Sequence, residues 1–434
     1  MIGLATFSLI IALAFLSLKS DRDAVSREIR AGFETGALVV DADWRFADVR
    51  IGAHQTNDCL ILLQAIDQRA TTAQLSITPL SAPTGTESMC LALSDAAAGT
   101  FDPDLRFYHN YVHAQTSVAR LLLPLLGVDG LRALYKLAVT VLLIAGLAIA
   151  TIGLAERRAL MRNALWLLLF ALFGRWFGFE SFGQSLGHGP SDLLILAFLL
   201  FLARGSRDAP MRERTALLGS GLFGALTMGF EMLTGGIPLG LALTIGCVPI
   251  ALAHDARIGV ATLRCAIAYL TAVAAVAVAK IAAVSIVFGT APVVAAIRQF
   301  LFRTGVDYDH NPDAPAGAHE FFTRVWAGFE SMAPGMHWLA VGMMSLALVL
   351  GGWGYAQLRR TRCKAVHFQA AAMAGSALVI PLWMVVFWQH TAQHAWFMDR
   401  ILIWPMAAGF ALFLMALIER ERIGAPDEQP AQLA

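Results

Sequence analysis

The sequence predicts an all-α transmembrane protein, a bundle of about ten helices with a large first extracytoplasmic loop that contains interfacial helices. Of the 434 residues, 57% are hydrophobic and only 15% are charged, whereas soluble domains average about 25% charged residues. The mean hydropathy is +0.63, and long apolar segments recur along the chain. The net charge of +1 and the lack of a basic patch with interleaved aromatic residues indicate no nucleic-acid partner.

The transmembrane segments follow from the length of each apolar run. A helix needs about 20 mostly apolar residues to cross the hydrocarbon core. The runs at 163–179, 189–203 and 237–253 are short, so these helices are expected to tilt little or to be partly re-entrant. The expected spans are 2–18, 133–154, 163–179, 189–203, 216–234, 237–253, 265–288, 338–357, 368–388 and 401–418.

The first apolar segment has two interpretations, an anchor or a signal peptide. It lacks a basic stretch before the apolar run, and no clear small-residue cleavage site precedes Lys19. Both features are expected of a cleaved signal peptide. We therefore expect residues 1–18 to be an uncleaved first transmembrane helix.

The distribution of basic residues predicts the orientation. With the N-terminus in the cytoplasm, the short outer loops at 180–188, 235–236 and 389–400 carry Arg400 alone. Because basic residues favour the cytoplasmic side, we expect a multi-pass protein of a bacterial inner membrane with both termini in the cytoplasm. The inner loops and tail carry Arg157, Arg158, Arg162, Arg204, Arg207, Arg212, Arg214, Arg257, Arg264, Arg359, Arg360, Arg362, Lys364, Arg420 and Arg422.

Two long outer segments divide the chain. Tyr111–Leu126 places apolar residues along one side, which favours either an interfacial helix or an ordinary helix packed on the loop. Glu320–Phe329 is a second candidate interfacial helix. The expected domains are the first helix (1–18), the extracytoplasmic loop domain (19–132), helices two to seven (133–288), the second extracytoplasmic loop (289–337), helices eight to ten (338–418) and the cytoplasmic tail (419–434).

The cysteines are consistent with this orientation. Cys59 and Cys90 both lie in the first outer loop, where an oxidising compartment would permit a disulfide between them. Cys247, Cys265 and Cys363 lie in or near inner segments and are expected to be unpaired.

Titratable residues gather on the outer side. Of the 11 histidines, only His254 and His367 are expected on the cytoplasmic side. Charged groups at membrane depth are costly and indicate functional sites, so a cavity that opens outward would explain the group. The alternative is a set of internal ion pairs, for example Glu231 with Lys280. The outer histidines are His54, His109, His113, His188, His310, His319, His337, His390 and His394, and the outer halves of the spans hold Arg175, Asp192, Glu231 and Lys280.

The first loop offers several carboxylates. Asp58 precedes the apolar run Leu60–Leu63, so it either caps a helix or serves as a base or metal ligand at the membrane surface. Asp41, Asp43 and Asp48 are the other candidates for that role.

Two pairs of histidines have helical spacing. His109 and His113 follow Arg106, and His390 and His394 precede Arg400; in each pair the i, i+4 spacing places both rings on one helix face. Together they offer ligands for a divalent metal. Without the glutamate of the HExxH pattern, however, phosphate binding by histidine and arginine is the favoured interpretation.

Other familiar motifs are missing from the sequence. The run that begins at Asp307 resembles a calcium loop, but Pro312 and Ala318 stand where Gly and Glu are needed. The chain has no P-loop, no GxGxxG motif after a strand and no GxSxG elbow, so nucleotide-driven pumping and serine hydrolysis have no support.

In the order of its parts, the chain resembles the GT-C superfamily of membrane glycosyltransferases. The resemblance lies in the many spans, the long first outer loop with its acidic candidates Asp41, Asp43, Asp48 and Asp58, and the histidines and arginines of later outer loops. It covers the architecture of most of the chain but includes no diagnostic motif, because Asp41-Ala-Asp43 only mimics a DxD sequence.

The resemblance implies a sugar transfer from a polyprenyl-phosphate donor to a cell-envelope acceptor at the outer face. Asp58 would deprotonate the acceptor, with Glu231 as a second catalytic carboxylate in the same cavity. The leaving phosphate and the substrate would be bound by His109, His113, Lys280, His390, His394 and Arg400.

Two other functions are compatible with the sequence. One is a transporter or flippase for a lipid-linked or anionic substrate, for which Gly- and Pro-rich helix starts near Gly189 and Gly236 offer support. The other is a non-enzymatic subunit for envelope assembly. The sequence identifies no definite cofactor, and a divalent metal is an alternative. The expected partners are the lipid-linked donor and membrane lipid, and the oligomeric state is left open.

Overall fold

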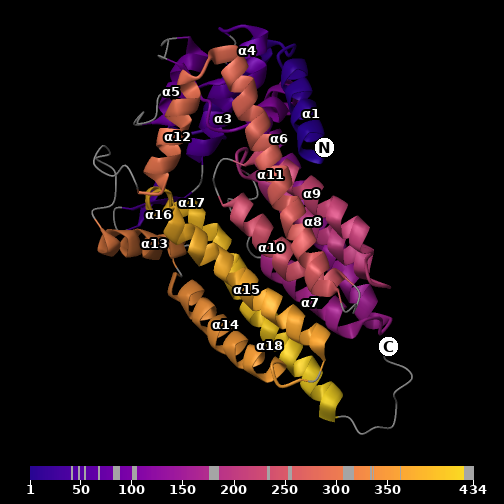
Figure 1. The fold of residues 1–434 in the computed structure, drawn as a ribbon. Coiled ribbons are helices and arrows are strands. Elements are labelled where there is room, and N and C mark those ends of the chain that lie inside the picture. The colour runs from indigo at the N-terminus through magenta and orange to yellow at the C-terminus, as the bar shows by residue number, and fades with distance from the viewer. Residues whose placement is uncertain are drawn as a thin grey trace.

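The computed structural model places the N-terminal elements in a lobe at one end of a long helical bundle (Figure 1). It describes residues 1–40, 43–46, 49–52, 55–66, 69–81, 88–99, 105–174, 185–231, 235–252, 257–305, 317–332, 335, 337–361 and 363–424.

The protein is all-α, with two short antiparallel strand pairs in addition. Among the described residues, six helices are long and apolar enough to cross a membrane, and the first two helices, bent by 86°, would make a seventh if they form one span. The structure therefore confirms an all-α protein with several apolar helices, and its helices of spanning length are fewer than the ten spans expected. The six are Ala114–Ala155, Gly189–Ser206, Ile258–Phe288, His337–Leu358, Lys364–Val386 and Arg400–Glu421.

The bundle is formed mainly by helices that follow residue 113. Expected spans at 163–179 and 237–253 correspond to the short helices α7 and α10. The bundle helices are α6 (Ala114–Ala155), α7 (Leu160–Phe173), α8 (Gly189–Ser206), α9 (Glu213–Phe230), α10 (Gly236–Ala251), α11 (Ile258–Phe288), α14 (His337–Leu358), α15 (Lys364–Val386) and α18 (Ile403–Gly424).

Glycines allow several bundle helices to pack backbone against backbone, as is common between membrane helices. A Cβ added at Gly409 would lie 2.3 Å from the carbonyl oxygen of Ala347, where α18 crosses α14. A Cβ at Gly224 of α9 would lie 2.4 Å from the carbonyl oxygen of Tyr269 in α11. A side chain at either position would therefore force the helices apart.

Four helices form the lobe, and α1 (Ile2–Ser17) packs along α9 and α11 of the bundle. The buried core of the lobe includes Val25, Ile29, Leu62 and Leu93. The elements of the lobe are α2 (Arg22–Glu34), β1 (Asp43–Phe46), β2 (Val49–Gly52), α3 (Gln55–Ile66), α4 (Thr72–Ile77), β3 (Leu80–Ser81), α5 (Met89–Ala98) and β4 (Arg106–Phe107), with β1 paired to β2 and β3 to β4.

The amphipathic segment at Tyr111–Leu126 contributes the first part of α6, which ends at a break in the helical backbone. The element α6 joins two helical pieces across Gly127, whose φ of 65° and ψ of −177° are not helical, and Pro124 lies shortly before that break. The first part of α6 is buried in the lobe, so the ordinary packed helix is the correct interpretation. Arg120, only 1% exposed, donates from Nε to the carbonyl of Ala65 and from Nη2 to that of Gln64, which caps the end of α3.

The remaining elements follow the long helix α11. Glu320–Phe329, expected as an interfacial helix, lies within α13, which carries an exposed Phe322. These elements are α12 (Ala291–Arg303), α13 (Ala318–Met332), α16 (Trp388–Gln393), α17 (Ala395–Met398) and the 3-10 helix η4 (Asp399–Leu402).

Candidate functional site

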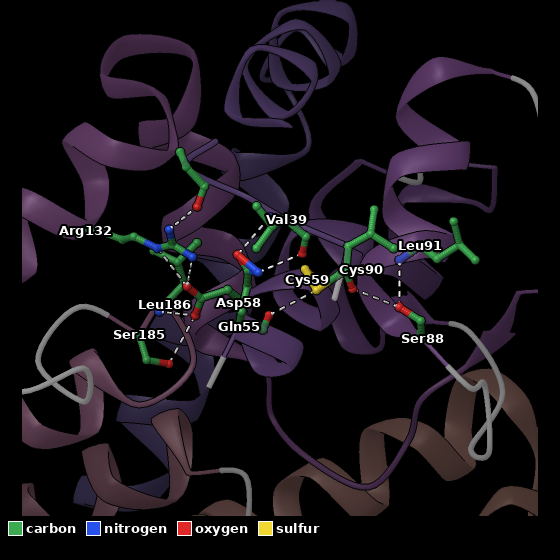
Figure 2. Close-up of a disulfide and its surroundings, with 12 residues drawn as sticks. Val39, Gln55, Asp58, Cys59, Ser88, Cys90, Leu91, Arg132, Ser185 and Leu186 are labelled. Carbon is green, nitrogen blue, oxygen red and sulfur yellow. Dashed lines mark hydrogen bonds and ion pairs between the residues drawn. A yellow bond between two sulfur atoms is a disulfide. The ribbon is translucent and has the colours of Figure 1, made fainter. Parts of the chain in front are cut away.

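The carboxylate of Asp58 is buried where α3 meets α6 and the turn before α8 (Figure 2). Arg132 donates to its Oδ2 from Nε at 2.9 Å and from Nη2 at 2.6 Å. Its Oδ1 accepts from the hydroxyl of Ser185 at 3.1 Å and from the backbone N–H of Leu186 at 2.6 Å. Burial raises the pKa of this carboxyl, and Arg132, Leu186 and Ser185 oppose that rise. With this many donors, the carboxylate is close to saturation.

Further contacts surround this ion pair. The Gln55 side chain pairs with both the N–H and the carbonyl of Val39, and the Asn57 amide lies 2.6 Å from Nε2 of His188. The predicted disulfide between Cys59 and Cys90 is present and joins α3 to α5, with the Cα atoms 5.0 Å apart (Figure 2). Asp58 is therefore part of a rigid junction between the lobe and the bundle.

A second buried group lies where α8, α10 and η4 meet. Arg400 of η4 donates from Nη1 to Oδ1 of Asp192 at 2.6 Å, and both side chains are 0% exposed. The other carboxylate oxygen of Asp192 has no hydrogen-bond partner within the described part of the chain. Glu231, which ends α9, accepts from the N–H of Gly236 at 3.1 Å and from the Ser191 hydroxyl at 3.4 Å. We call Ser191, Asp192, Glu231, Gly236 and Arg400 the charged cluster.

Helix starts explain why acidic groups are stable in the charged cluster. Ser191 and Asp192 lie in the first turn of α8, and Gly236 is the first residue of α10. The positive ends of both helix dipoles therefore face the carboxylates. A Cβ at Gly236 would lie 2.1 Å from Oε2 of Glu231, so a side chain at this position would displace the carboxylate from its place at the start of α10. The cluster combines carboxylates that can accept a proton with a guanidinium that can stabilise negative charge.

The first histidine pair lies near Lys280, beside the lobe. Lys280 donates to the carbonyl of Ile77 and, at 2.9 Å, to the hydroxyl of Thr78. The ion pair suggested between Glu231 and Lys280 does not form, because each has these other partners instead. Nε2 of His113 lies 2.8 Å from the carbonyl of Tyr108, so Nε2 carries the proton. Nδ1 of His113 is buried and has no hydrogen-bond partner in the described residues.

Both histidines of this pair are neutral at physiological pH. Burial lowers the pKa of His113 to about 3 and that of His109 to about 4, and the charge of Lys280 adds to both shifts. A neutral imidazole offers one donor and one acceptor rather than a positive charge. His109 and His113 therefore suit hydrogen bonding to a hydroxyl better than ion pairing with phosphate.

The neutral state of His113 predicts how stability depends on pH. The unfolded chain protonates this residue near 6.5, whereas the folded chain does so near 3. The contribution of neutral His113 to the free energy of unfolding is thus complete above pH 6.5. It falls by about 1.4 kcal/mol per pH unit as the pH decreases from 6.5 towards 3. Asn tolerates the left-handed backbone of this position, where φ is 63°, so His113→Asn should unfold with a smaller pH slope in chemical denaturation. The exposed His319 supplies the control, His319→Asn, and equal slopes for His113→Asn and the wild type would contradict the assignment.

The second histidine pair lies at α16, which precedes α17 and η4 in the chain. His390 is buried on α16, and its ring lies 4.7 Å from that of His394, centroid to centroid. Arg400 points instead to Asp192. No group of three or more residues that could hold a metal ion occurs among the residues that the structure describes.

Several candidate site residues from the sequence belong to none of these groups. His54, Asp41, Asp48, Arg175 and the run that begins at Asp307 lie outside the described residues, as does the side chain of Asp43. His337 lies in an ion pair with Glu330, with Nδ1 2.6 Å from Oε2.

Residues that the sequence alone did not single out complete these groups. Arg132, Ser185 and Ser191 each contact a predicted acidic residue. Arg132, an arginine at the boundary between the loop and the bundle, is the one that carries a detectable sequence signal, because charge is costly there. Comparison with protein-family models, with curated proteins and with solved structures gives no match for this chain.

Proposed function

We propose that this protein is a membrane glycosyltransferase that transfers a sugar from a polyprenyl-phosphate donor to a cell-envelope acceptor at the outer face of the membrane. The observation that carries the proposal is the charged cluster, in which Glu231 lies at the starts of α8 and α10 beside the ion pair of Asp192 and Arg400. The cluster lies at the end of the bundle that meets the lobe, since the turn before α8 contacts Asp58.

The proposed mechanism assigns the base to Glu231. Asp58 is close to saturated by donors from Arg132, Ser185 and Leu186, which favours a structural role for it. Glu231 accepts the proton of the acceptor hydroxyl, the acceptor oxygen bonds to the anomeric carbon, and the bond from that carbon to the phosphate oxygen breaks. Arg400, oriented by Asp192, stabilises the charge of the leaving polyprenyl phosphate.

The other predicted substrate residues have roles outside the charged cluster in this scheme. His109, His113 and Lys280 form a polar group beside the lobe. In this scheme they would contact hydroxyl groups of the sugar or acceptor. His390 lies on α16, and His394 follows the last residue of that helix; both would contact the donor phosphate. A divalent metal is not needed for this scheme.

The orientation is part of the proposal. A disulfide forms in oxidising compartments, and the bond between Cys59 and Cys90 supports an extracytoplasmic lobe. The ion pair of Arg158 with Asp208 joins the arginine-rich turns after α6 and α8 at the opposite end, which the positive-inside rule assigns to the cytoplasm. Both features fit a bacterial inner membrane with cytoplasmic termini.

A transporter or flippase is the second candidate function. The observation that favours it is the position of the charged cluster at two helix starts, α8 and α10, which resembles the discontinuous helices of transporters. Such a protein would move the lipid-linked substrate without releasing polyprenyl phosphate.

The variant Glu231→Gln tests the proposal directly. In vesicles with a polyprenyl-phosphate sugar and an extract of envelope acceptors, wild-type protein should release polyprenyl phosphate, and Glu231→Gln should reduce the rate about 100-fold or more. Glu213→Gln, at the exposed start of α9 in an ion pair with Arg264, is the matched control and should retain activity. Full turnover by Glu231→Gln would remove Glu231 from the mechanism, and lipid translocation without release by the wild type would favour the transporter.

A further inference from the structure

A cavity opens at the end of the bundle opposite to the lobe, between the end of α8 and the start of α9. Its volume is about 500 Å³. Arg162 joins this region to the rest of the bundle, because its side chain donates to the carbonyls of Ile250 and Ser206. The lining includes Phe201, Arg204, Asp208, Met211, Arg212 and Thr215.

The charges around this cavity do not balance. The Asp208 carboxylate is engaged by Arg158, at 2.8 Å, and by two nitrogens of Arg207, each at 2.9 Å. Arg204 and Arg212 also line the cavity, and neither has a carboxylate partner in the described part of the chain. Two guanidinium groups therefore line the cavity beside a carboxylate that other arginines already engage, and phosphate oxygens match their planar donor geometry.

An apolar surface continues from the cavity towards the membrane core. Phe201 packs on α9 where a Cβ at Gly219 would lie 2.3 Å from its ring. Leu218 and Leu222 lie about one and two turns beyond Thr215 on α9, and they are 50% and 48% exposed. A ligand in the cavity would thus have an anionic head beside the arginines and an apolar tail beside α8 and α9.

We propose that this cavity binds the phosphate headgroup of an anionic phospholipid from the cytoplasmic leaflet, with its acyl chains along Phe201, Leu218 and Leu222. Basic pockets between membrane helices on the cytoplasmic side bind such headgroups. A free phosphate would use the arginines but would leave the adjoining apolar surface unused. The proposal concerns a site at the other end of the bundle from the charged cluster and does not depend on sugar transfer.

Native mass spectrometry and thermal unfolding of the purified full chain in detergent test this proposal. Phosphatidylglycerol should bind and raise the melting temperature, whereas phosphatidylethanolamine and inorganic phosphate should have little effect. The double variant Arg204→Gln/Arg212→Gln should bind phosphatidylglycerol at least tenfold more weakly. Arg359→Gln/Arg360→Gln, which removes two exposed arginines at the end of α14, is the matched control and should bind as the wild type does.

Three results would overturn the proposal. They are equal affinity of the wild type and the cavity variant for phosphatidylglycerol, equal binding of phosphatidylethanolamine, and binding of inorganic phosphate as tight as that of the lipid. Melting of both double variants without lipid shows whether they fold. Because the cavity arginines are exposed, both should melt near the wild-type temperature.

Discussion

Replacing Arg132 with Ala is expected to destabilise the protein by about 3–5 kcal/mol, because the substitution leaves the buried Asp58 carboxylate without its charged partner. The side chain of Asp58 is 3% exposed, and Arg132 approaches it to 2.6 Å. Arg132 also donates to the carbonyl of Ala37, so the substitution weakens the contact of the lobe with α6 as well. Chemical denaturation in detergent measures the loss, and Arg30→Ala, at an exposed position of α2, should cost little.

A double variant distinguishes the structural role of Asp58 from a catalytic one. Asp58→Asn/Arg132→Met removes both charges, and it should recover part of the stability lost in Arg132→Ala. Under the proposed mechanism, any fall in sugar transfer by Asp58→Asn should follow its fall in stability. If Asp58→Asn instead abolished transfer while its unfolding free energy stayed at the wild-type value, Asp58 would be the base, as the sequence suggested.

Much of the fold could be predicted because it depends on local composition. Apolar runs of sufficient length indicated an all-α protein with several apolar helices, and the shared loop of Cys59 and Cys90 permitted the disulfide that the structure contains. The number of spanning helices could not be predicted, since α7 and α10 are short and their place depends on neighbours rather than on length. The break that Pro124 indicates is present, because the non-helical backbone of Gly127 separates the two helical pieces of α6.

The sequence indicated which charged residues are buried, but not the partners with which they pair. The cost of burying charge drew attention to Asp58, Glu231, Lys280 and Arg400, and all four are buried. Several of their partners lie far away in sequence: Arg132 is 74 residues from Asp58, and Asp192 is 208 residues from Arg400. Lys280 finds its acceptors at the end of α4 rather than at Glu231. Only packing of the helices determines such contacts, and one chain without its fold does not specify them.

Replacing Arg400 with Met is expected to cost about 3–5 kcal/mol of stability, because the substitution leaves the fully buried carboxylate of Asp192 without its charged partner. Neither side chain of this pair is exposed. Asp192→Asn/Arg400→Met removes both charges and should be more stable than Arg400→Met alone, since an uncharged amide is far less costly to bury. Thermal and chemical unfolding of the three variants against the wild type measures this coupling.

The same double variant separates the structural and catalytic contributions of Arg400. If the guanidinium stabilises the leaving phosphate, Asp192→Asn/Arg400→Met should remain inactive in polyprenyl phosphate release even where its stability is recovered. Arg400→Lys keeps the charge but loses the planar fork, so it should retain more activity than Arg400→Met and less than the wild type. A stable double variant with wild-type turnover would show that the pair only holds η4 against α8, and the phosphate would then have to be bound elsewhere, with Lys280 and the two histidine pairs as the next residues to test.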